Sequence, residues 1–428
     1  MASLECKGIG IDFGTTNTVV SIADNNQNVQ VLNLDDGPLF KSLLYFPKRS
    51  EAFFGNHAIN EYVERGMEGR FFQSVKRLLP NPDFTGTSLY GQHVGVEDLV
   101  ARFLQETKKR IEQKLNQKIE TFPICMGRPA RYSNDPAHEG LAVVRFKKAI
   151  ELAQFNSPLK LVEEPVAAAA SMANDTVSDN SIEGYTLIAD LGGGTSDFSL
   201  YHERIGKTPE VLSVHGVSVA GDALDSDFFV SKLNPIFGSE IKYQRPFSSN
   251  ILTMPTSIVK SLPKWHHHAF LKERATWGFI TTLKKELVDQ KQKPLLENLI
   301  TLVEDNCGYK LHQAVESLKI KLSSENQSPF VFKSYPIDIL FDVLQTDWNQ
   351  MIQVSVDQIT KTAIDTCRIA KVNPDDIKLI RFTGGTSQVP EVRQAIQRQF
   401  KNAKATDHNT FTAVSEGLAL LASHDLRG

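Results

Sequence analysis

The chain of 428 residues has few of the features that mark secreted, membrane or nucleic-acid-binding proteins. Its four cysteines, Cys6, Cys125, Cys307 and Cys367, lie far apart, and none forms a C-x-x-C pair. This spacing argues against a disulfide framework and against a zinc site, and it favours a reducing compartment. The formal net charge is −3, so no basic surplus predicts binding to nucleic acid or to anionic lipid.

Long hydrophobic runs are also missing. The N-terminus has no apolar signal region, and charged or polar residues interrupt every apolar stretch, which argues against secretion and against a membrane span. We therefore expect a cytoplasmic protein that binds neither membranes nor nucleic acid. A hydrophobic fraction of 41% and a charged fraction of 23% are typical of a soluble globular protein. The length predicts two or more lobes.

One short pattern occurs twice, at Asp12–Thr16 and at Asp190–Thr195. In each copy an aspartate ends an apolar run, a glycine turn and a threonine follow, and a second apolar run comes next. This order predicts strand, turn and strand. An internal repeat of such a unit predicts two structurally related lobes.

Each residue type in the repeat suits a phosphate group. Glycines let backbone N–H groups converge on an anion, threonines add hydroxyl donors, and a strand-terminal aspartate offers Mg²⁺ a hard oxygen, directly or through water. One copy alone would be better interpreted as an ordinary hairpin turn. Two copies facing each other across a cleft could grip the β- and γ-phosphates of a nucleotide. The sequence contains no G-x-x-x-x-G-K-[ST] segment, so a P-loop is excluded.

Elsewhere, short apolar runs alternate with segments of helical periodicity, which predicts an α/β protein. We place a lobe boundary in the polar segment 174–184. The predicted lobe I comprises residues 1–183 with 407–428, and lobe II comprises 184–406 with a mainly helical subdomain at about 235–325. Residues 235–265 show no clear pattern, and 336–370 are predicted to form one or two helices.

The segments GIDFGTTNTVVSI (10–22) and ADLGGGTSDFSL (189–200) resemble the two phosphate motifs of the DnaK-type, seventy-kilodalton heat-shock chaperones. The similarity continues in the order of that family. The further matching segments are SVKRLL (74–79), VEEPVAAA (162–169), ESLKIKLSS (316–324) and FTGGTSQVP (382–390). Because these motifs span about residues 8 to 422, the resemblance implies an actin-like ATPase fold. Such a fold has two lobes, each with a ribonuclease H-like mixed sheet, and binds ATP or ADP in the cleft between them.

The resemblance also implies roles for individual residues. Asp12, Asp190 and Glu164 would orient water around Mg²⁺, and Lys76 would place a positive charge near the γ-phosphate and the attacking water. Asp197 would orient that water or bind a monovalent cation such as K⁺, and Thr195 would bond phosphate oxygen. Further nucleotide contacts are expected from Gly14, Thr15, Thr16, Asn17, Gly192, Gly193, Gly194, Gly221, Asp222, Glu316, Lys319, Ser323, Gly384, Gly385, Thr386 and Gln388.

Several of these residues also have an ordinary structural interpretation. Lys76 could be a solvated surface lysine, Glu164 a charge favoured at a helix N-terminus, and Asp197 a turn cap. Glu316 and Lys319 could form an exposed pair on a helix. Gly384 and Gly385 could form a plain turn. The complete set in one order favours the nucleotide site.

The chain departs from the family pattern at several positions. Ile320 and Gln388 stand where the family has two arginines that sandwich the base, and such contacts contribute about 0.5–2 kcal/mol each. Weaker affinity or looser base preference is therefore expected. Ala220 replaces a glycine. Residues 237–311 are unusual, and Trp265 with the histidines after it is expected to form a partly exposed aromatic and polar turn rather than a metal site. The Pro-x-Trp pattern resembles YegD, a short member of the family.

The sequence ends at Gly428, where the resemblance to the nucleotide-binding domain also ends, so we expect a member that lacks the peptide-binding domain. The predicted function is that of a chaperone-like ATPase that opens and closes its lobes with ATP and ADP and acts on a protein partner or client. Three alternatives remain open: a small-molecule kinase with Asp197 as base, an actin-like filament protein, and a nucleotide-binding pseudo-ATPase.

Overall fold

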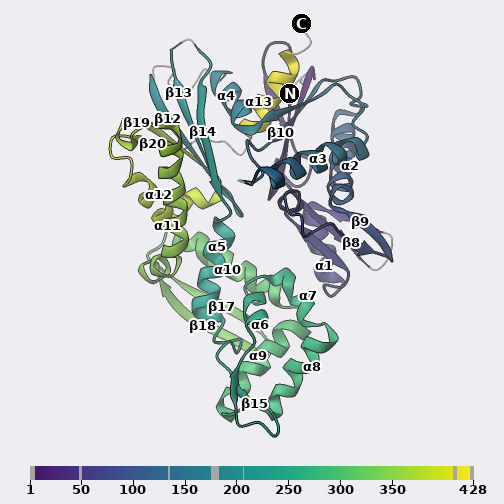
Figure 1. The fold of residues 1–428 in the computed structure, drawn as a ribbon, viewed down its shortest axis with the longest axis vertical. Helices are drawn as coiled ribbons and strands as arrows, with labels where there is room; N and C mark the ends of the chain where they lie inside the picture. Colours follow the sequence, from purple (N-terminus) through teal and green to yellow (C-terminus); the bar gives the residue numbers. More distant parts are fainter. Residues whose placement is uncertain are drawn as a thin grey trace.

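A computed structural model describes residues 5–47, 51–133, 135–174, 183–205, 207–407 and 412–424. Two parts, each built on a large sheet, lie side by side at one end of the molecule, and a mainly helical segment extends toward the other end (Figure 1). The boundary predicted within 174–184 falls mostly on residues outside the described ranges.

The first large sheet has the strand order β11-β10-β1-β2-β3, with β4 also pairing with β2. β1 is antiparallel to β2 and parallel to β10, which is parallel to β11. The strands are β1 (Gly8–Phe13), β2 (Asn17–Ala23), β3 (Val29–Leu32), β4 (Phe40–Lys41), β10 (Ile124–Arg128) and β11 (Leu159–Glu163).

The second large sheet repeats this topology in the order β14-β13-β12-β19-β20. β12 is antiparallel to β13 and parallel to β19, as β1 is to β2 and β10. The strands are β12 (Gly184–Leu191), β13 (Ser196–Glu203), β14 (Glu210–Val217), β19 (Ile377–Thr383) and β20 (Lys404–Asp407). The shared order confirms that the repeated aspartate, glycine and threonine segments belong to two structurally related units, which we call lobe I and lobe II.

Helices from distant parts of the chain cover the first sheet. α2 (Val96–Leu115) and α3 (Pro136–Leu152) share a hydrophobic core with β1 and β2. α4 (Glu164–Asn174) and α13 (Ala413–His424) pack against each other, and α13 also lies on β1. The approach is close because glycines lack side chains: a Cβ on Gly10 would lie 2.1 Å from the Ser415 carbonyl oxygen, and one on Gly417 1.8 Å from that of Ala167.

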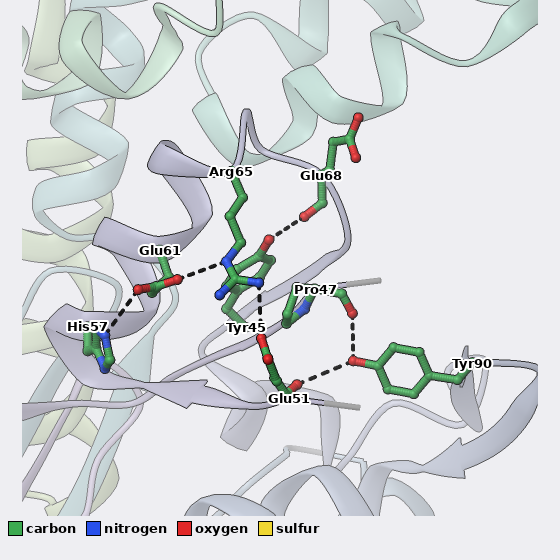
Figure 2. A network of polar contacts seen from close by, with 8 residues as sticks. All are labelled: Tyr45, Pro47, Glu51, His57, Glu61, Arg65, Glu68 and Tyr90. Carbon is green, nitrogen blue, oxygen red and sulfur yellow. Dashed lines mark hydrogen bonds and ion pairs between the residues drawn. The ribbon is translucent and has the colours of Figure 1, made fainter. Parts of the chain in front are cut away.

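A smaller sheet in lobe I packs against α1. A network of polar contacts holds it together, in which the Tyr45 hydroxyl donates to the Glu68 carbonyl oxygen at 2.6 Å and Arg65 bridges Glu51 and Glu61 (Figure 2). The elements of this region are β5 (Leu43–Phe46), β6 (Phe53–Phe54), α1 (Gly55–Glu64), β7 (Arg70–Gln73), the 3₁₀ turn η1 (Val75–Leu78), β8 (Gly86–Leu89) and β9 (Gln92–Gly95).

Lobe II buries a larger core, to which the strands and helices after the second sheet contribute. The helices predicted over 336–370 are wrong in part, because residues 337–344 form a strand, and an unpredicted strand pairs with it. In that strand Ile337, Ile339 and Val343 are buried while Asp338 and Asp342 are exposed, a period of two. The elements are α5 (Gly221–Phe228), the π-helical turn η2 (Phe229–Leu233), α10 (Gly308–Leu322), β17 (Gln327–Ser334), β18 (Ile337–Leu344), α11 (Gln345–Ala370) and α12 (Pro390–Gln397).

The mainly helical segment begins with a hairpin and a helix where the sequence shows no clear pattern. Its elements are β15 (Lys242–Gln244), β16 (Ile251–Thr253), α6 (Thr256–Ser261), the turn η3 (Trp265–His267), α7 (His268–Leu271), α8 (Arg274–Thr282) and α9 (Lys293–Glu304). The expected partly exposed turn is wrong for Trp265 and His268, which are buried. Trp265 packs instead against Tyr62 and Phe71 of lobe I, which supplies the apolar surroundings.

Candidate nucleotide site

The first phosphate hairpin joins β1 to β2 through Gly14, Thr15 and Thr16. Ser42 supports it from behind: its hydroxyl donates to the Gly14 carbonyl oxygen at 2.8 Å, and its backbone N–H donates to the Thr16 carbonyl oxygen at 2.9 Å. Asn17 opens β2 opposite Lys41. Because the carbonyl oxygens of Gly14 and Thr16 both accept hydrogen bonds from Ser42, the turn is held in one conformation. Thr15, between them, lines the cleft.

The second hairpin joins β12 to β13, and its ends place Asp190 directly opposite Asp197. The Gly192 N–H donates to the Thr195 carbonyl oxygen at 2.9 Å. The Asp222 N–H, at the start of α5, donates to the Gly193 carbonyl oxygen at 2.7 Å. The Thr386 hydroxyl donates to the Gly192 carbonyl oxygen, also at 2.7 Å. This turn is therefore fixed by two other parts of lobe II, one on each side.

The two hairpins meet across the cleft. A Cβ placed on Gly193 would lie 3.4 Å from Asp222 Oδ1 and 3.7 Å from the Thr16 hydroxyl oxygen, so residues from both lobes surround this glycine. A cavity of about 700 Å³ lies beside them. Its lining includes the phosphate-end residues predicted from the sequence: Asp12, Gly14, Thr15, Lys76, Glu164, Asp190, Thr195 and Asp197.

Lys76 is buried, which rules out the interpretation of a solvated surface lysine. Its ammonium group lies 2.6 Å from Glu164 Oε1, and its side chain is 7% exposed. Ser74, which precedes the turn η1, has a φ of 58°, a left-handed conformation that directs the following residues into the cleft. Glu164 begins α4, so a helix start positions the partner of Lys76.

Carboxylates crowd the floor of the cleft and raise one another's pKa. Burial, with the neighbouring charges of Glu164 and Asp190, raises the pKa of Asp12 to about 8, although Lys76 opposes the shift. Burial and the charges of Asp197 and Glu164 raise the pKa of Asp190 to about 7. Burial also raises the pKa of Asp197 to about 6, against a hydrogen bond from Thr195. Such a site favours a bound cation, which would relieve the repulsion.

The residues fit a hydrated metal ion better than a directly ligated one. Among the described residues, no three His, Cys, Asp or Glu side chains lie close enough together to hold an ion directly. Mg²⁺ commonly keeps several waters and is bound through few carboxylates. The donor set of Asp12, Asp190 and Glu164 therefore matches an ion held through its water shell.

The loop expected to contact adenosine follows β19 at the same edge of the sheet as the second hairpin. Thr383, the last residue of β19, lies opposite Asp190. Gly384 has a φ of 83°, and a Cβ there would lie 2.2 Å from the Leu191 carbonyl oxygen, so this position requires glycine. Gly385 and Gln388 are exposed. The loop thus lies against the second hairpin: Gly384 is next to Leu191, and Thr386 is hydrogen-bonded to Gly192.

Of the three positions predicted in this region, Glu316 and Lys319 lie on α10 and Ser323 directly follows its last residue, and the three have different surroundings. Glu316 is exposed, while the Ser323 hydroxyl donates to the Lys319 carbonyl oxygen at 2.9 Å. The Lys319 ammonium group lies 2.6 Å from Oδ2 of Asp225, which is buried. Lys319 thus pairs with α5 rather than with Glu316. A Cβ on Gly221 would lie 3.4 Å from Lys319 Nζ and 2.9 Å from the Thr386 hydroxyl oxygen. The start of α5, the helix α10 and the loop after β19 therefore meet at Gly221.

Sequence reasoning missed three residues of the site: Ser42, Asp225 and Arg77. Ser42 has no sequence signal, because its role depends on β4 folding back beside the hairpin. Asp225 lies one helical turn after Asp222, a spacing that could have suggested a second inward carboxylate. Arg77 follows Lys76 directly, and its guanidinium donates a hydrogen bond to the Gly194 carbonyl oxygen of lobe II.

Comparison with known proteins agrees with this geometry. The family model described as Hsp70 protein matches residues 286–425. The chain is 26% identical over 424 residues to the chaperone protein DnaK of Mycoplasmopsis agalactiae, covering 96% of this chain and 58% of that protein. Identity to DnaK of Mycoplasmopsis pulmonis is 24% over 420 residues, covering 96% and 57%. For DnaK of Mycoplasma mobile it is 25% over 423 residues, covering 97% and 57%.

The chain is therefore similar to Hsp70 proteins over residues 286–425 and to DnaK-type chaperones over most of its own length. This similarity and the two sheets of shared strand order indicate the actin-like ATPase fold of Hsp70 proteins. The chain spans 58% or less of the length of these Hsp70 relatives. Across the described ranges, no helix combines the length and apolar character needed to cross a bilayer.

Proposed function

We propose that this chain binds Mg-ATP in the cleft between its lobes and hydrolyses it by attack of water on the γ-phosphate. The observation that carries the proposal is the buried Lys76–Glu164 pair, 2.6 Å apart, at the floor of a cavity shared by two phosphate hairpins. A positive charge at this position stabilises the charge that develops on the transferred phosphoryl group.

Each residue of the floor has a role in this proposal. The backbone N–H groups of the two hairpins, with Thr15, Thr16 and Thr195, bind phosphate oxygens from both sides. Water adds to the γ-phosphorus, the bond to the bridging oxygen breaks, and ADP and inorganic phosphate result. Asp197 orients the water and takes up its proton. Phosphoryl transfer needs little beyond such positioning and electrostatics.

Mg²⁺, when bound, neutralises the charge of the β- and γ-phosphates. Asp12, Asp190 and Glu164 would hold its water shell, and Asp197 would also suit K⁺. At the adenosine end, the Gly384–Gln388 loop and α10 would face ribose and base through Glu316, Lys319 and Ser323. Loss of the γ-phosphate would loosen the contact between the hairpins, so hydrolysis would open the lobes. In our proposal, residues 1–183 with 407–428 move as one lobe against 184–406.

Isothermal titration with ATP in the presence of Mg²⁺ tests binding, and release of inorganic phosphate tests hydrolysis. Absence of both heat and a thermal shift with Mg-ATP would refute the proposal. Lys76→Ala should keep ATP binding and lose about 10²–10³-fold in turnover, the usual cost of removing one electrostatic donor. Lys118→Ala is the matched control, since Lys118 also pairs with a glutamate, at 2.9 Å, but is 78% exposed.

The same assays separate the alternatives. Phosphate that appears on an added metabolite rather than free in solution would show a kinase, and binding without turnover would show a pseudo-ATPase. Light scattering that rises with protein concentration and ATP would show a filament protein. We propose that the nucleotide state acts on a protein partner or client. Capture of one partner with ATP and not with ADP would support that step, and equal capture with both would refute it.

A further inference from the structure

Two successive side chains of the turn η1 contact different lobes. The ammonium group of Lys76 faces Glu164 within lobe I. The guanidinium of Arg77 crosses the cleft and donates a hydrogen bond to the Gly194 carbonyl oxygen in lobe II. The lysine turn and the second phosphate hairpin are therefore joined directly by Arg77.

The turn that presents Arg77 is held firmly from within lobe I. Val75 and Leu79, on either side of the Lys76–Arg77 pair, are fully buried. From α3, Arg145 Nη1 donates to the carbonyl oxygens of Leu79 at 3.1 Å and Asn81 at 2.8 Å. Because this turn is fixed to the rest of lobe I, the hydrogen bond of Arg77 links lobe I itself to lobe II.

The contact with lobe II involves much of the guanidinium group. A Cβ built on Gly194 would lie 2.9 Å from Arg77 Nη2 and 3.2 Å from its Cζ, so a glycine is what admits the group. Burial raises the pKa of Asp197 and of Asp222, and the positive charge of Arg77 opposes both shifts, which places it within electrostatic reach of both carboxylates. Among the described residues, no carboxylate comes within ion-pair distance of Arg77, and its remaining N–H groups stay available.

We propose that Arg77 is a positioning residue that locks the lysine turn of lobe I onto the second phosphate hairpin of lobe II and thereby sets the closed geometry for hydrolysis. The inference rests on the proposed ATPase function. The guanidinium can hold the hairpin with one N–H and face phosphate oxygens with others, a geometry that arginine offers and lysine does not. Its loss should slow turnover far more than it weakens nucleotide binding, because each lobe keeps its own hairpin.

The kinetic test compares Arg77→Ala and Arg77→Lys with the parent chain and with Arg398→Ala, a surface arginine paired with Glu391 on α12. We expect Arg77→Ala to lose about 10–100-fold in kcat, the effect of one charge-assisted hydrogen bond. The Kd for ADP should change less than about 3-fold, and Arg398→Ala should match the parent. Arg77→Lys should also keep the Kd for ADP within about 3-fold of the parent and should recover little of the lost kcat. A kcat of Arg77→Ala within twofold of the parent would overturn the inference.

A second measurement needs no nucleotide, because the contact is present in the protein alone. Hydrogen exchange at the amides of 192–195 should quicken at least about tenfold in Arg77→Ala, with partial protection restored in Arg77→Lys. Unchanged exchange in Arg77→Ala would also overturn the inference. A parent chain that shows neither binding nor hydrolysis of Mg-ATP would refute the ATPase function, while the exchange result would still decide whether Arg77 joins the lobes.

Discussion

The aromatic contact between the helical segment and lobe I should control how fast a nucleotide leaves. The ring of Trp265 lies 6.0 Å from that of Tyr62 on α1 and 5.1 Å from that of Phe71 on β7, centroid to centroid. On its own side it lies 5.0 Å from Tyr309 at the start of α10. Trp265 is 6% exposed, so it fills the space between the two lobes. Tyr45, which belongs to the polar network of Figure 2, packs against the rings of both Tyr62 and Phe71.

The magnitude follows from the two ring pairs that cross between the lobes. An aromatic pair contributes about 0.5–1.5 kcal/mol beyond the area it buries. Two pairs therefore favour the closed arrangement by about 1–3 kcal/mol, or roughly 5–150-fold in the equilibrium between open and closed lobes. If nucleotide leaves from the open form, Trp265→Ala should raise its dissociation rate by a factor in this range.

Stopped-flow displacement of a fluorescent ATP analogue measures that rate. Trp277→Ala is the control, because Trp277 lies on α8 in the same segment and is only partly buried against the lobe II core. A double-mutant cycle with Tyr62→Leu isolates the pair and should give a coupling energy of about 0.5–1.5 kcal/mol. Equal dissociation rates in the parent and Trp265→Ala, with both folded, would refute the reasoning.

Three further predictions concern the cleft. The pKa of Asp12 in the folded protein is about 8, above its unfolded value of 3.8, so its contribution to stability is lost as pH rises from about 4 to 8. In nucleotide-free protein, the gain in melting temperature from Asp12→Asn should grow over that range and level off above it; a gain independent of pH would contradict the shift. Lys319→Ala should cost about 3–5 kcal/mol in chemical unfolding, because it leaves the buried Asp225 carboxylate unpaired. Adding Asp225→Asn should recover part of that loss, and no recovery would argue against the pair. Because Ile320 is 63% exposed and Gln388 is also exposed, we expect the Kd for GTP to lie within about 10-fold of that for ATP by titration, and a larger preference would show another base contact.

The phosphate hairpins could be predicted from sequence because everything that defines them is local. An apolar strand, a glycine turn and a threonine are contiguous in the chain, and their repetition indicated two related sheets. The helix Val96–Leu115 has an equally local signal, because its buried apolar residues, from Val96 to Ile111, recur at helical spacing. The strand at 337–344 was missed because its alternation is short and joins directly onto the long helix α11.

Tertiary structure decided which side chains meet. Lys76 and Glu164 are 88 residues apart and form a buried pair, while Lys319 finds Asp225 rather than its helical neighbour Glu316. Trp265 in an apparently polar segment is buried because lobe I supplies the aromatic surface that its neighbours in sequence lack. Arg77 reaches across the cleft because a buried turn directs it there. Local sequence determined the two glycine turns, but the pairing of charges and rings across the cleft depends on contacts between residues far apart in the chain, which no local pattern encodes.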